Sequence, residues 1–256
     1  MSRLSNAEIA ASLNEAYRQN EMFSDALAGV LTLEEAYQVQ FDLAELRVAD
    51  GEKLTGWKVG LTSKAMQEQQ GVHEPCLGYL LQSGQVISPA KFQFDELISP
   101  GFENEICIRL KSPLSGVGVS FDEALAAIEE IAPALEIIER RCNFSSGLAL
   151  AIAGNAQQRS FITGPFMTIA SVADLSKIEA SVEVNEVVQE TATGDKVLGN
   201  PVNSLIWLAA KLSEFGRSLD AGTLVMSGSF TKQYLLNKGD YVRTSFKGVG
   251  VVEASF

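Results

Sequence analysis

The first fifty residues carry apolar side chains at the three- and four-residue spacing of an amphipathic helix, and they do so twice. Each stretch begins with a capping box, in which a hydroxyl residue, Ser5 or Thr32, is followed by glutamate three positions later. Gly51 ends the second stretch. These patterns predict a helical N-terminal region over residues 1–52. The apolar positions are Ile9, Leu13 and Ala16 in the first helix and Leu33, Tyr37 and Phe41 in the second.

After Gly51 the pattern changes to short runs of β-type residues separated by glycine and proline. Two helices interrupt these runs: one follows a capping box at Ser120 and Glu123, and the other extends from Asn200-Pro201 to Gly216. Because the runs do not alternate regularly with helices, they predict an α+β fold with an antiparallel or mixed sheet. We expect one catalytic domain over residues 53–256. The predicted strands are 57–61, 85–87, 105–110, 134–138, 161–164, 178–188, 224–226, 240–246 and 249–252.

The composition, with 46% hydrophobic and 20% charged residues, is that of a globular chain with enough apolar material for a large core. The longest apolar stretches end well short of the roughly 20 residues that span a bilayer, and the first residues lack the apolar segment of a secretory signal. We therefore expect a cytoplasmic protein. A net charge of -12 disfavours binding to nucleic acid or to anionic membranes. An anionic substrate then requires local positive charge, which a cation held by carboxylates can supply.

The three cysteines, Cys76, Cys107 and Cys142, stand at no spacing typical of a metal site, in a chain with a single histidine. We expect buried or neutral thiols instead of a disulfide framework or a zinc site. The histidine, His73, has no serine or cysteine at the spacing of a catalytic triad, which favours a solvated loop position over a general base. The next residues, 74–78, are typical of a turn or the start of a lid.

A short acidic motif is the strongest candidate for chemistry, because Glu103 and Glu105 open an apolar β-type run. Side chains two apart on a strand point to the same side, so the two carboxylates repel unless a cation or a proton compensates them. Glu136 lies inside another apolar segment, where an ionised glutamate is rarely buried without a partner. Three carboxylates without histidine or cysteine form an oxygen site suited to Mg²⁺ or Mn²⁺. The alternative is an exposed pair at a strand edge, with Glu136 paired to Arg140 or Arg141.

A lysine in an apolar strand is the second candidate. Lys58 is flanked by glycines and leads to the hydroxyl residues Thr62 and Ser63. It is either a surface residue on an edge strand or an inward-facing cation that binds an oxyanion or transfers a proton. Ser229 lies in a glycine turn after another strand, where it is either structural or oxyanion-binding. The residues alone leave both alternatives open.

Six segments follow one another along the chain: GWKVGLTSKAMQ, EPCLGYL, the acidic motif FENE, PALEII, GNPVNSLIWLAAKL and MSGSFT. Together they resemble the 2-keto-4-pentenoate hydratase / 4-oxalocrotonate decarboxylase family of the fumarylacetoacetate hydrolase superfamily. The similarity spans nearly the whole chain. The combination of segments is specific, although no single motif is.

The resemblance implies a mixed β-roll catalytic domain of the fumarylacetoacetate hydrolase C-terminal type behind the helical region. It implies a Mg²⁺ or Mn²⁺ ion held by the three glutamates, with Lys58 as a catalytic residue. It also implies homo-oligomers built from dimers, a complex with another enzyme of the same pathway, and a role in aromatic compound catabolism. The resemblance extends to substrate binding by Thr62, Ser63 and Ser229, and to Glu139 and Asn155 as groups that support the site.

The implied activity is that of a lyase acting on a small 2-oxo acid. The leading hypothesis is a hydratase, in which 2-hydroxypenta-2,4-dienoate ketonises and takes up water to give 4-hydroxy-2-oxopentanoate. The alternative is a decarboxylase, in which 2-oxohex-3-enedioate (4-oxalocrotonate) loses CO₂. Hydrolysis of a C–C bond in an acylpyruvate ranks lower, because it usually requires an acid–base dyad and His73 is the single histidine.

Three positions depart from the family pattern, since Gly154, Cys76 and Glu139 stand where aspartate is usual. The loss of carboxylates around the site leaves the reaction open, although not the metal site itself. The departures also admit a further hypothesis, a metal-binding subunit without turnover that supports an active partner.

Overall fold

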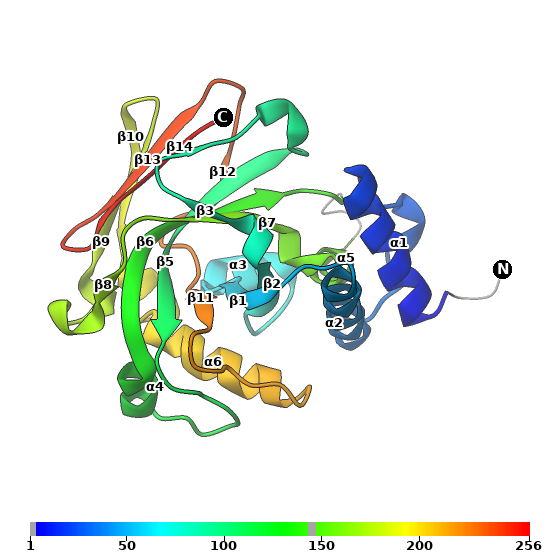
Figure 1. Ribbon diagram of the computed structural model, residues 1–256, viewed down its shortest axis with the longest axis horizontal. Coiled ribbons are helices and arrows are strands. Elements are labelled where there is room, and N and C mark those ends of the chain that lie inside the picture. Colours follow the sequence, from blue (N-terminus) through cyan, green and yellow to red (C-terminus); the bar gives the residue numbers. More distant parts are fainter. Residues whose placement is uncertain (1–3, 143–146) are drawn as a thin grey trace.

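Two helices pack against each other at the N-terminal end of the computed structural model, which describes residues 4–142 and 147–256 (Figure 1). Helix α1 covers Asn6–Gln19 and helix α2 covers Leu33–Ala49, and both begin with the predicted capping boxes. Their buried side chains belong to the same hydrophobic core as Trp57 of the first strand. The helical region is confirmed, whereas a domain boundary after residue 52 stays a prediction.

A curled mixed sheet is the centre of the fold. In the described part of the chain it contains nine strands, in the order β2-β1-β11-β5-β6-β7-β3, with β12 paired to β5 and β8 paired to β6. The pairs β1/β11 and β3/β7 are parallel, and the others are antiparallel. The strands are β1 Leu54–Gly60, β2 Cys76–Leu81, β3 Gln85–Ile87, β5 Pro100–Leu110, β6 Ile128–Glu139, β7 Gln158–Thr163, β8 Met167–Thr168, β11 Leu224–Met226 and β12 Tyr234–Leu235.

A second sheet of five strands, counted over the described residues, has the order β10-β9-β13-β14-β4. Its strands β13 and β14 contact β6 of the larger sheet (Figure 1). Its strands are β4 Ala90–Lys91, β9 Glu179–Val184, β10 Val187–Thr193, β13 Tyr241–Phe246 and β14 Gly250–Ser255. The mixed sheet confirms the predicted α+β class with a mixed β-roll.

Four shorter helices cover the larger sheet and connect its strands. They are α3 Lys64–Gln70, α4 Phe121–Ala127, α5 Leu148–Ala153 and α6 Val202–Ser213. The capping box at Ser120 starts α4, as predicted. The 3₁₀ turns are η1 Asp25–Leu27, η2 Gln82–Gly84, η3 Phe94–Glu96, η5 Asn155–Gln157, η6 Ile169–Ser171, η7 Leu175–Lys177 and η8 Gly194–Lys196. Within residues 4–142 and 147–256, no helix combines the length and apolar character needed to cross a membrane.

Several sequence-based predictions were wrong in local detail. The segment from Glu74 to Gly78 is not a lid: from Cys76 onward it is the buried strand β2, paired with β1. The predicted strand 178–188 is a hairpin, because Asn185 and Glu186 adopt positive φ and separate β9 from β10. The sequence patterns also missed α3 and α5. Both helices are short, and a single turn or two of helix shows too little periodicity to detect.

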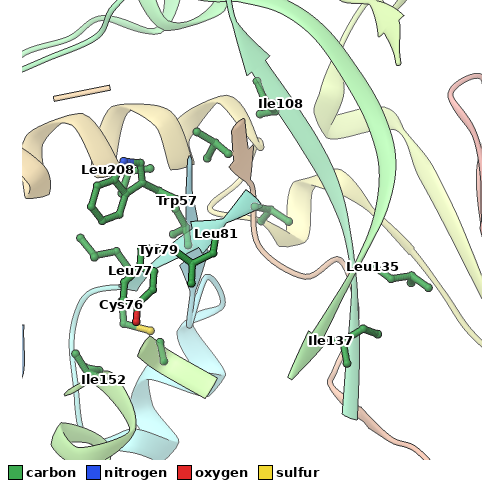
Figure 2. Packing of buried hydrophobic residues seen from close by; sticks show 14 of the residues in the cluster. Trp57, Cys76, Leu77, Tyr79, Leu81, Ile108, Leu135, Ile137, Ile152 and Leu208 are labelled. Atoms are coloured by element: carbon green, nitrogen blue, oxygen red, sulfur yellow. The ribbon is translucent and has the colours of Figure 1, made fainter. Parts of the chain in front are cut away.

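The main core lies where β1 and β2 meet the surrounding helices. Figure 2 shows Trp57, Leu77 and Tyr79 in one cluster with Leu208 of α6 and Ile152 of α5. Burying such a side chain stabilises the fold by about 1.5–3 kcal/mol before entropy is counted. This packing holds β1 and β2 rigidly against the strands that carry the acidic residues.

Candidate metal centre and active site

Three glutamate side chains converge between β5 and β6. Glu103 and Glu105 share one face of β5, and Glu136 of β6 lies directly opposite Glu103 in the antiparallel ladder. One carboxylate oxygen from each residue lies within 4.8 Å of the other two. Strand β5 is flanked by β11 and β6. The alternative of an exposed pair at a strand edge is therefore wrong.

Nearby arginines do not neutralise these carboxylates. Arg141 forms an ion pair with Glu139, with its Nη2 2.7 Å from Oε2, and Arg140 donates to Ser99 at 2.8 Å. The suggested pairing of Glu136 with Arg140 or Arg141 is therefore excluded. The negative charge of the three carboxylates therefore requires compensation by a group other than these arginines.

Three oxygens at this centre are buried without a hydrogen-bond partner in the described residues: Oε1 of Glu105 and both carboxylate oxygens of Glu136, of which Oε1 has only the ion-pair contact with Lys58 at 3.4 Å. Both side chains are fully buried, whereas Glu103 is half-buried. Oε2 of Glu105 accepts a hydrogen bond from the backbone N–H of Gly228 at 2.8 Å, which orients its carboxylate. Orphaned carboxylate oxygens that face one point are the arrangement that a hard divalent cation satisfies, so the residues present fit Mg²⁺ or Mn²⁺.

Burial makes ionisation of the three carboxyl groups unfavourable in the absence of a cation. Burial and the neighbouring Glu136 raise the pKa of Glu103 to about 7, although Lys58 opposes the shift. Burial, with the charges of Glu136 and Glu103, also raises the pKa of Glu105 well above its usual value. The pKa of Glu136 is raised by burial in spite of Lys58. A divalent ion would remove this penalty.

Lys58 of β1 is buried at 4% exposure, so it is not a surface residue. Its Nζ lies 3.4 Å from Oε1 of Glu136. Lys58 pairs with Gly78 of the neighbouring strand β2. A Cβ at Gly78 would lie 3.1 Å from Cε of Lys58, so the glycine leaves room for the lysine side chain. Burial lowers the pKa of Lys58, but the negative charge of Glu136, together with Glu103 and Glu105, outweighs burial and raises it. Lys58 is therefore a cation in this setting.

A cavity opens beside Lys58 and Glu103. Helices α3 and α5 contribute much of its wall, and Cys76 of β2 contributes a thiol. Burial raises the pKa of Cys76 to about 11, which keeps the thiol neutral. All three cysteines are buried and free, as predicted. The further lining residues, which the sequence patterns did not indicate, include Met66, Gln70, Leu148, Ile152, Gln157 and Gln233.

A strained turn forms one side of the cavity. Asn155, Ala156 and Gln157 have successive φ values of 66°, 48° and 66°, a conformation that costs non-glycine residues free energy. The side chain of Asn155 stabilises the turn, because it accepts from the N–H of Tyr79 at 2.7 Å and donates to the carbonyl of the same residue at 3.0 Å. The turn places Ala156 and Gln157 at the cavity. Asn155 thus supports the wall from behind.

The remaining predicted positions lie around the centre in different ways. Ser63 caps α3 by accepting from the N–H of Met66, and Ser229 donates to the carbonyl of Asn104 at 3.4 Å. Thr62 is buried against Gly228. Glu139 accepts from the N–H of Ile98 and pairs with Arg141, away from the other three glutamates. The described residues that line the cavity include none of the five predicted substrate-binding or supporting residues, which are Thr62, Ser63, Glu139, Asn155 and Ser229. His73 is exposed between α3 and β2, as predicted.

The fold and the site define an α+β protein with a buried carboxylate centre suited to a divalent metal. Residues 67–256 match the family described as "Fumarylacetoacetate (FAA) hydrolase C-terminal". The chain belongs to the fumarylacetoacetate hydrolase family. Within it, the chain is a hydratase or a decarboxylase, as the similarities to individual proteins show.

The chain is similar to a 2-hydroxypent-2,4-dienoate hydratase of Pseudomonas putida, with 36% identity over 73% of this chain and 85% of the relative. It is 32% identical to a 2-oxo-hept-4-ene-1,7-dioate hydratase of Escherichia coli, over 97% of this chain and 96% of the relative. Among solved structures, a 4-oxalocrotonate decarboxylase from Pseudomonas putida G7, complexed with magnesium and adipate, superposes with a TM-score of 0.94 at 31% identity. That superposition covers 99% of this chain and 98% of the other.

Proposed function

We propose that the protein is a metal-dependent hydratase that adds water to a 2-hydroxyalka-2,4-dienoate and gives a 4-hydroxy-2-oxo acid. The observation that supports this proposal is the convergence of Glu103, Glu105 and Glu136 beside the buried cation Lys58, at one end of a cavity. This arrangement suits a ligand with a negatively charged 2-oxo acid end. The rest of the cavity accepts the carbon chain.

The three glutamates would hold Mg²⁺ or Mn²⁺, and the ion when bound supplies a Lewis acid for the carboxylate and keto oxygens of the substrate. Lys58 supplies a positive charge from the protein itself. Its Nζ lies 3.4 Å from Oε1 of Glu136, so it can donate a hydrogen bond or a proton at the 2-oxygen of a substrate held at the same centre. The site therefore stabilises negative charge that develops on the 2-oxygen.

The reaction needs two proton movements and one water. The 2-hydroxyl proton of the dienol leaves and a proton is delivered at C5, which gives the conjugated enone. Water then adds at C4, and C3 takes a proton. Gln157 and Gln233 line the same cavity, and their neutral amides can hold the incoming water by hydrogen bonds. Cys76 stands where an aspartate is usual, but as a neutral thiol it does not replace a carboxylate base.

Turnover is tested directly with purified protein and 2-hydroxypenta-2,4-dienoate. In the presence of Mg²⁺, the ultraviolet absorbance of the dienoate is expected to fall, and NMR should identify 4-hydroxy-2-oxopentanoate. EDTA should stop the reaction and added Mg²⁺ should restore it. The NMR readout separates hydration from ketonisation alone. Failure to hydrate dienoates of any chain length would overturn the proposal.

Decarboxylation of 2-oxohex-3-enedioate is the second candidate, favoured by the TM-score of 0.94 to the decarboxylase structure. The two reactions share the 2-oxo acid end of the substrate and differ in the fate of the other end. Release of CO₂ from the dicarboxylic acid, without water uptake by the dienoate, would favour this candidate. Homo-oligomers built from dimers and a complex with a pathway enzyme stay predictions, which light scattering of the purified protein can examine.

A further inference from the structure

The cavity has one charged end and one uncharged end. At the charged end lie Lys58 and Glu103, which are the charged groups among the described residues of the lining. Away from them, the wall consists of aliphatic and thioether side chains and three glutamine amides. The apolar side chains are Leu61, Met66, Ile138, Leu148 and Ile152.

Two helices form the uncharged end. Met66 belongs to α3, whereas Leu148 and Ile152 belong to α5. The amide of Gln40 in α2 donates to the carbonyl of Ile152 at 2.7 Å and to that of Leu77 at 2.9 Å. The wall is therefore fastened to the N-terminal helices and to β2. Figure 2 shows Ile152 near Cys76, which lines the cavity on β2.

The two arginines that follow the lining residue Ile138 in the sequence form hydrogen bonds outside the cavity. Arg141 is 3% exposed and bonds Glu139, Asn20 and the carbonyl of Glu21. Arg140 bonds Ser99, and neither arginine is among the described lining residues. Consequently no described cation other than Lys58 faces the cavity, and Lys58 is already beside Glu136.

A carboxylate that leaves water for this uncharged end would lose hydration without gaining a counter-charge, which makes its binding unfavourable. Glutamine amides supply hydrogen bonds but no charge. A hydrocarbon tail, in contrast, gains from contact with the aliphatic wall. The two kinds of tail should thus differ in affinity even when their 2-oxo acid ends are identical.

We propose that the site selects a 2-oxo acid with a single carboxylate, whose uncharged hydrocarbon tail lies between α3 and α5. This inference rests on the proposed function, because it takes the carboxylate centre as the place of the 2-oxo acid end. Met66, Leu148 and Ile152 then determine specificity for the tail. A dicarboxylic 2-oxo acid is the alternative occupant, and the hydratase from Escherichia coli and the Pseudomonas decarboxylase are both named for dicarboxylic acids.

Binding of two unreactive ligands tests the proposal on the Mg²⁺-loaded protein. 2-Oxohexanoate and 2-oxoadipate have the same number of carbons and differ in whether the tail ends in a methyl group or a carboxylate. Isothermal titration calorimetry is expected to give a dissociation constant at least about tenfold lower for 2-oxohexanoate, which corresponds to about 1.4 kcal/mol. Equal or tighter binding of 2-oxoadipate would overturn the proposal.

A charge added to the wall gives an independent test. Met66 is 38% exposed, so Met66→Lys is tolerated by the fold, and it should tighten 2-oxoadipate binding at least about tenfold while weakening 2-oxohexanoate. Gln69→Lys places the same charge on an exposed position of α3 outside the cavity lining, and it should leave both constants within about twofold. Similar effects of the two variants would contradict the assignment of the tail site.

These outcomes are distinct from failure of the hydratase proposal. If 2-oxohexanoate is preferred but no dienoate is hydrated, the proposed reaction is wrong and the tail specificity stands. If neither ligand binds in the presence of Mg²⁺, the cavity is not the 2-oxo acid site and the inference is overturned.

Discussion

The ring of Phe23 fills the space that a side chain at Gly154 would need. A Cβ placed on Gly154 would lie 2.2 Å from Cε2 of Phe23, far inside van der Waals contact. The hydroxyl of Tyr17 also donates to the carbonyl of Gly154 at 2.8 Å. The N-terminal region therefore packs directly on the residue that precedes the strained turn of the cavity. An aspartate at this position would clash with the Phe23 ring as it is placed in this chain.

Gly154→Ala should destabilise the protein by about 1–3 kcal/mol, because the new methyl group forces the Phe23 ring or the turn to move. Urea unfolding of Gly154→Ala, of Phe23→Ala and of the double variant measures the coupling free energy between the two positions. The cost of Gly154→Ala is expected to shrink in the Phe23→Ala background, although Phe23→Ala itself costs about 3–5 kcal/mol. Strictly additive effects would show that the two residues do not compete for the same space.

Glu105→Gln should weaken Mn²⁺ binding at least about 100-fold, since it removes a ligand charge and leaves a buried amide at the centre. Electron paramagnetic resonance of free Mn²⁺ measures the change. The matched control is Glu129→Gln, an exposed glutamate on the same strand as Glu136, which should bind Mn²⁺ normally. Tight Mn²⁺ binding by Glu105→Gln would refute the proposed centre.

Lys58→Met should lower kcat by at least about 100-fold while Mn²⁺ affinity stays the same or increases. The variant removes the positive charge at the substrate oxygen, and it also removes a cation that repels the metal. Turnover and Mn²⁺ titrations are measured on the same preparation, with the exposed Lys64→Met as control. A loss of Mn²⁺ affinity that accounts for the whole fall in turnover would assign Lys58 a structural role.

The metal should stabilise the protein more at pH 8 than at pH 6. In the metal-free fold, burial and Glu136 raise the pKa of Glu103 from 4.5 to about 7. Between these values the folded state holds a proton that the unfolded state has lost, so stability falls as the pH rises through this window. Bound Mn²⁺ replaces the proton, and at pH 6 it must compete with it. Tm values with Mn²⁺ and with EDTA at both pH values measure the difference; an equal gain at both would contradict it.

Gln40→Leu should destabilise the protein by about 1–3 kcal/mol, because it leaves the carbonyls of Leu77 and Ile152 buried without their shared donor. Chemical denaturation measures the change in the free energy of unfolding. Gln38→Leu, on the exposed side of the same helix, is the control and should change stability by less than about 0.5 kcal/mol. Equal effects would mean that the buried amide does not bridge β2 and α5.

Features that depend on neighbouring residues were predictable from the sequence. The capping boxes at Ser5, Thr32 and Ser120 start helices, because each bonds backbone groups three residues away. Glu103 and Glu105 share one face because a strand alternates its side chains. Likewise the lack of regular strand–helix alternation was enough to predict the α+β class. These relationships are set by backbone geometry over a few residues.

The tertiary structure decided which distant residues meet. Glu136 lies opposite Glu103 because of the register between β5 and β6, and Lys58 reaches Glu136 because β1 pairs with β11 in the curled sheet. The cavity wall depends on α5 and on the turn at Gln157, which has a positive φ. This turn is stabilised by the hydrogen bond between Asn155 and Tyr79, which lie far apart in the sequence. Such features arise from pairing and packing across long sequence separations, where no local pattern carries the information.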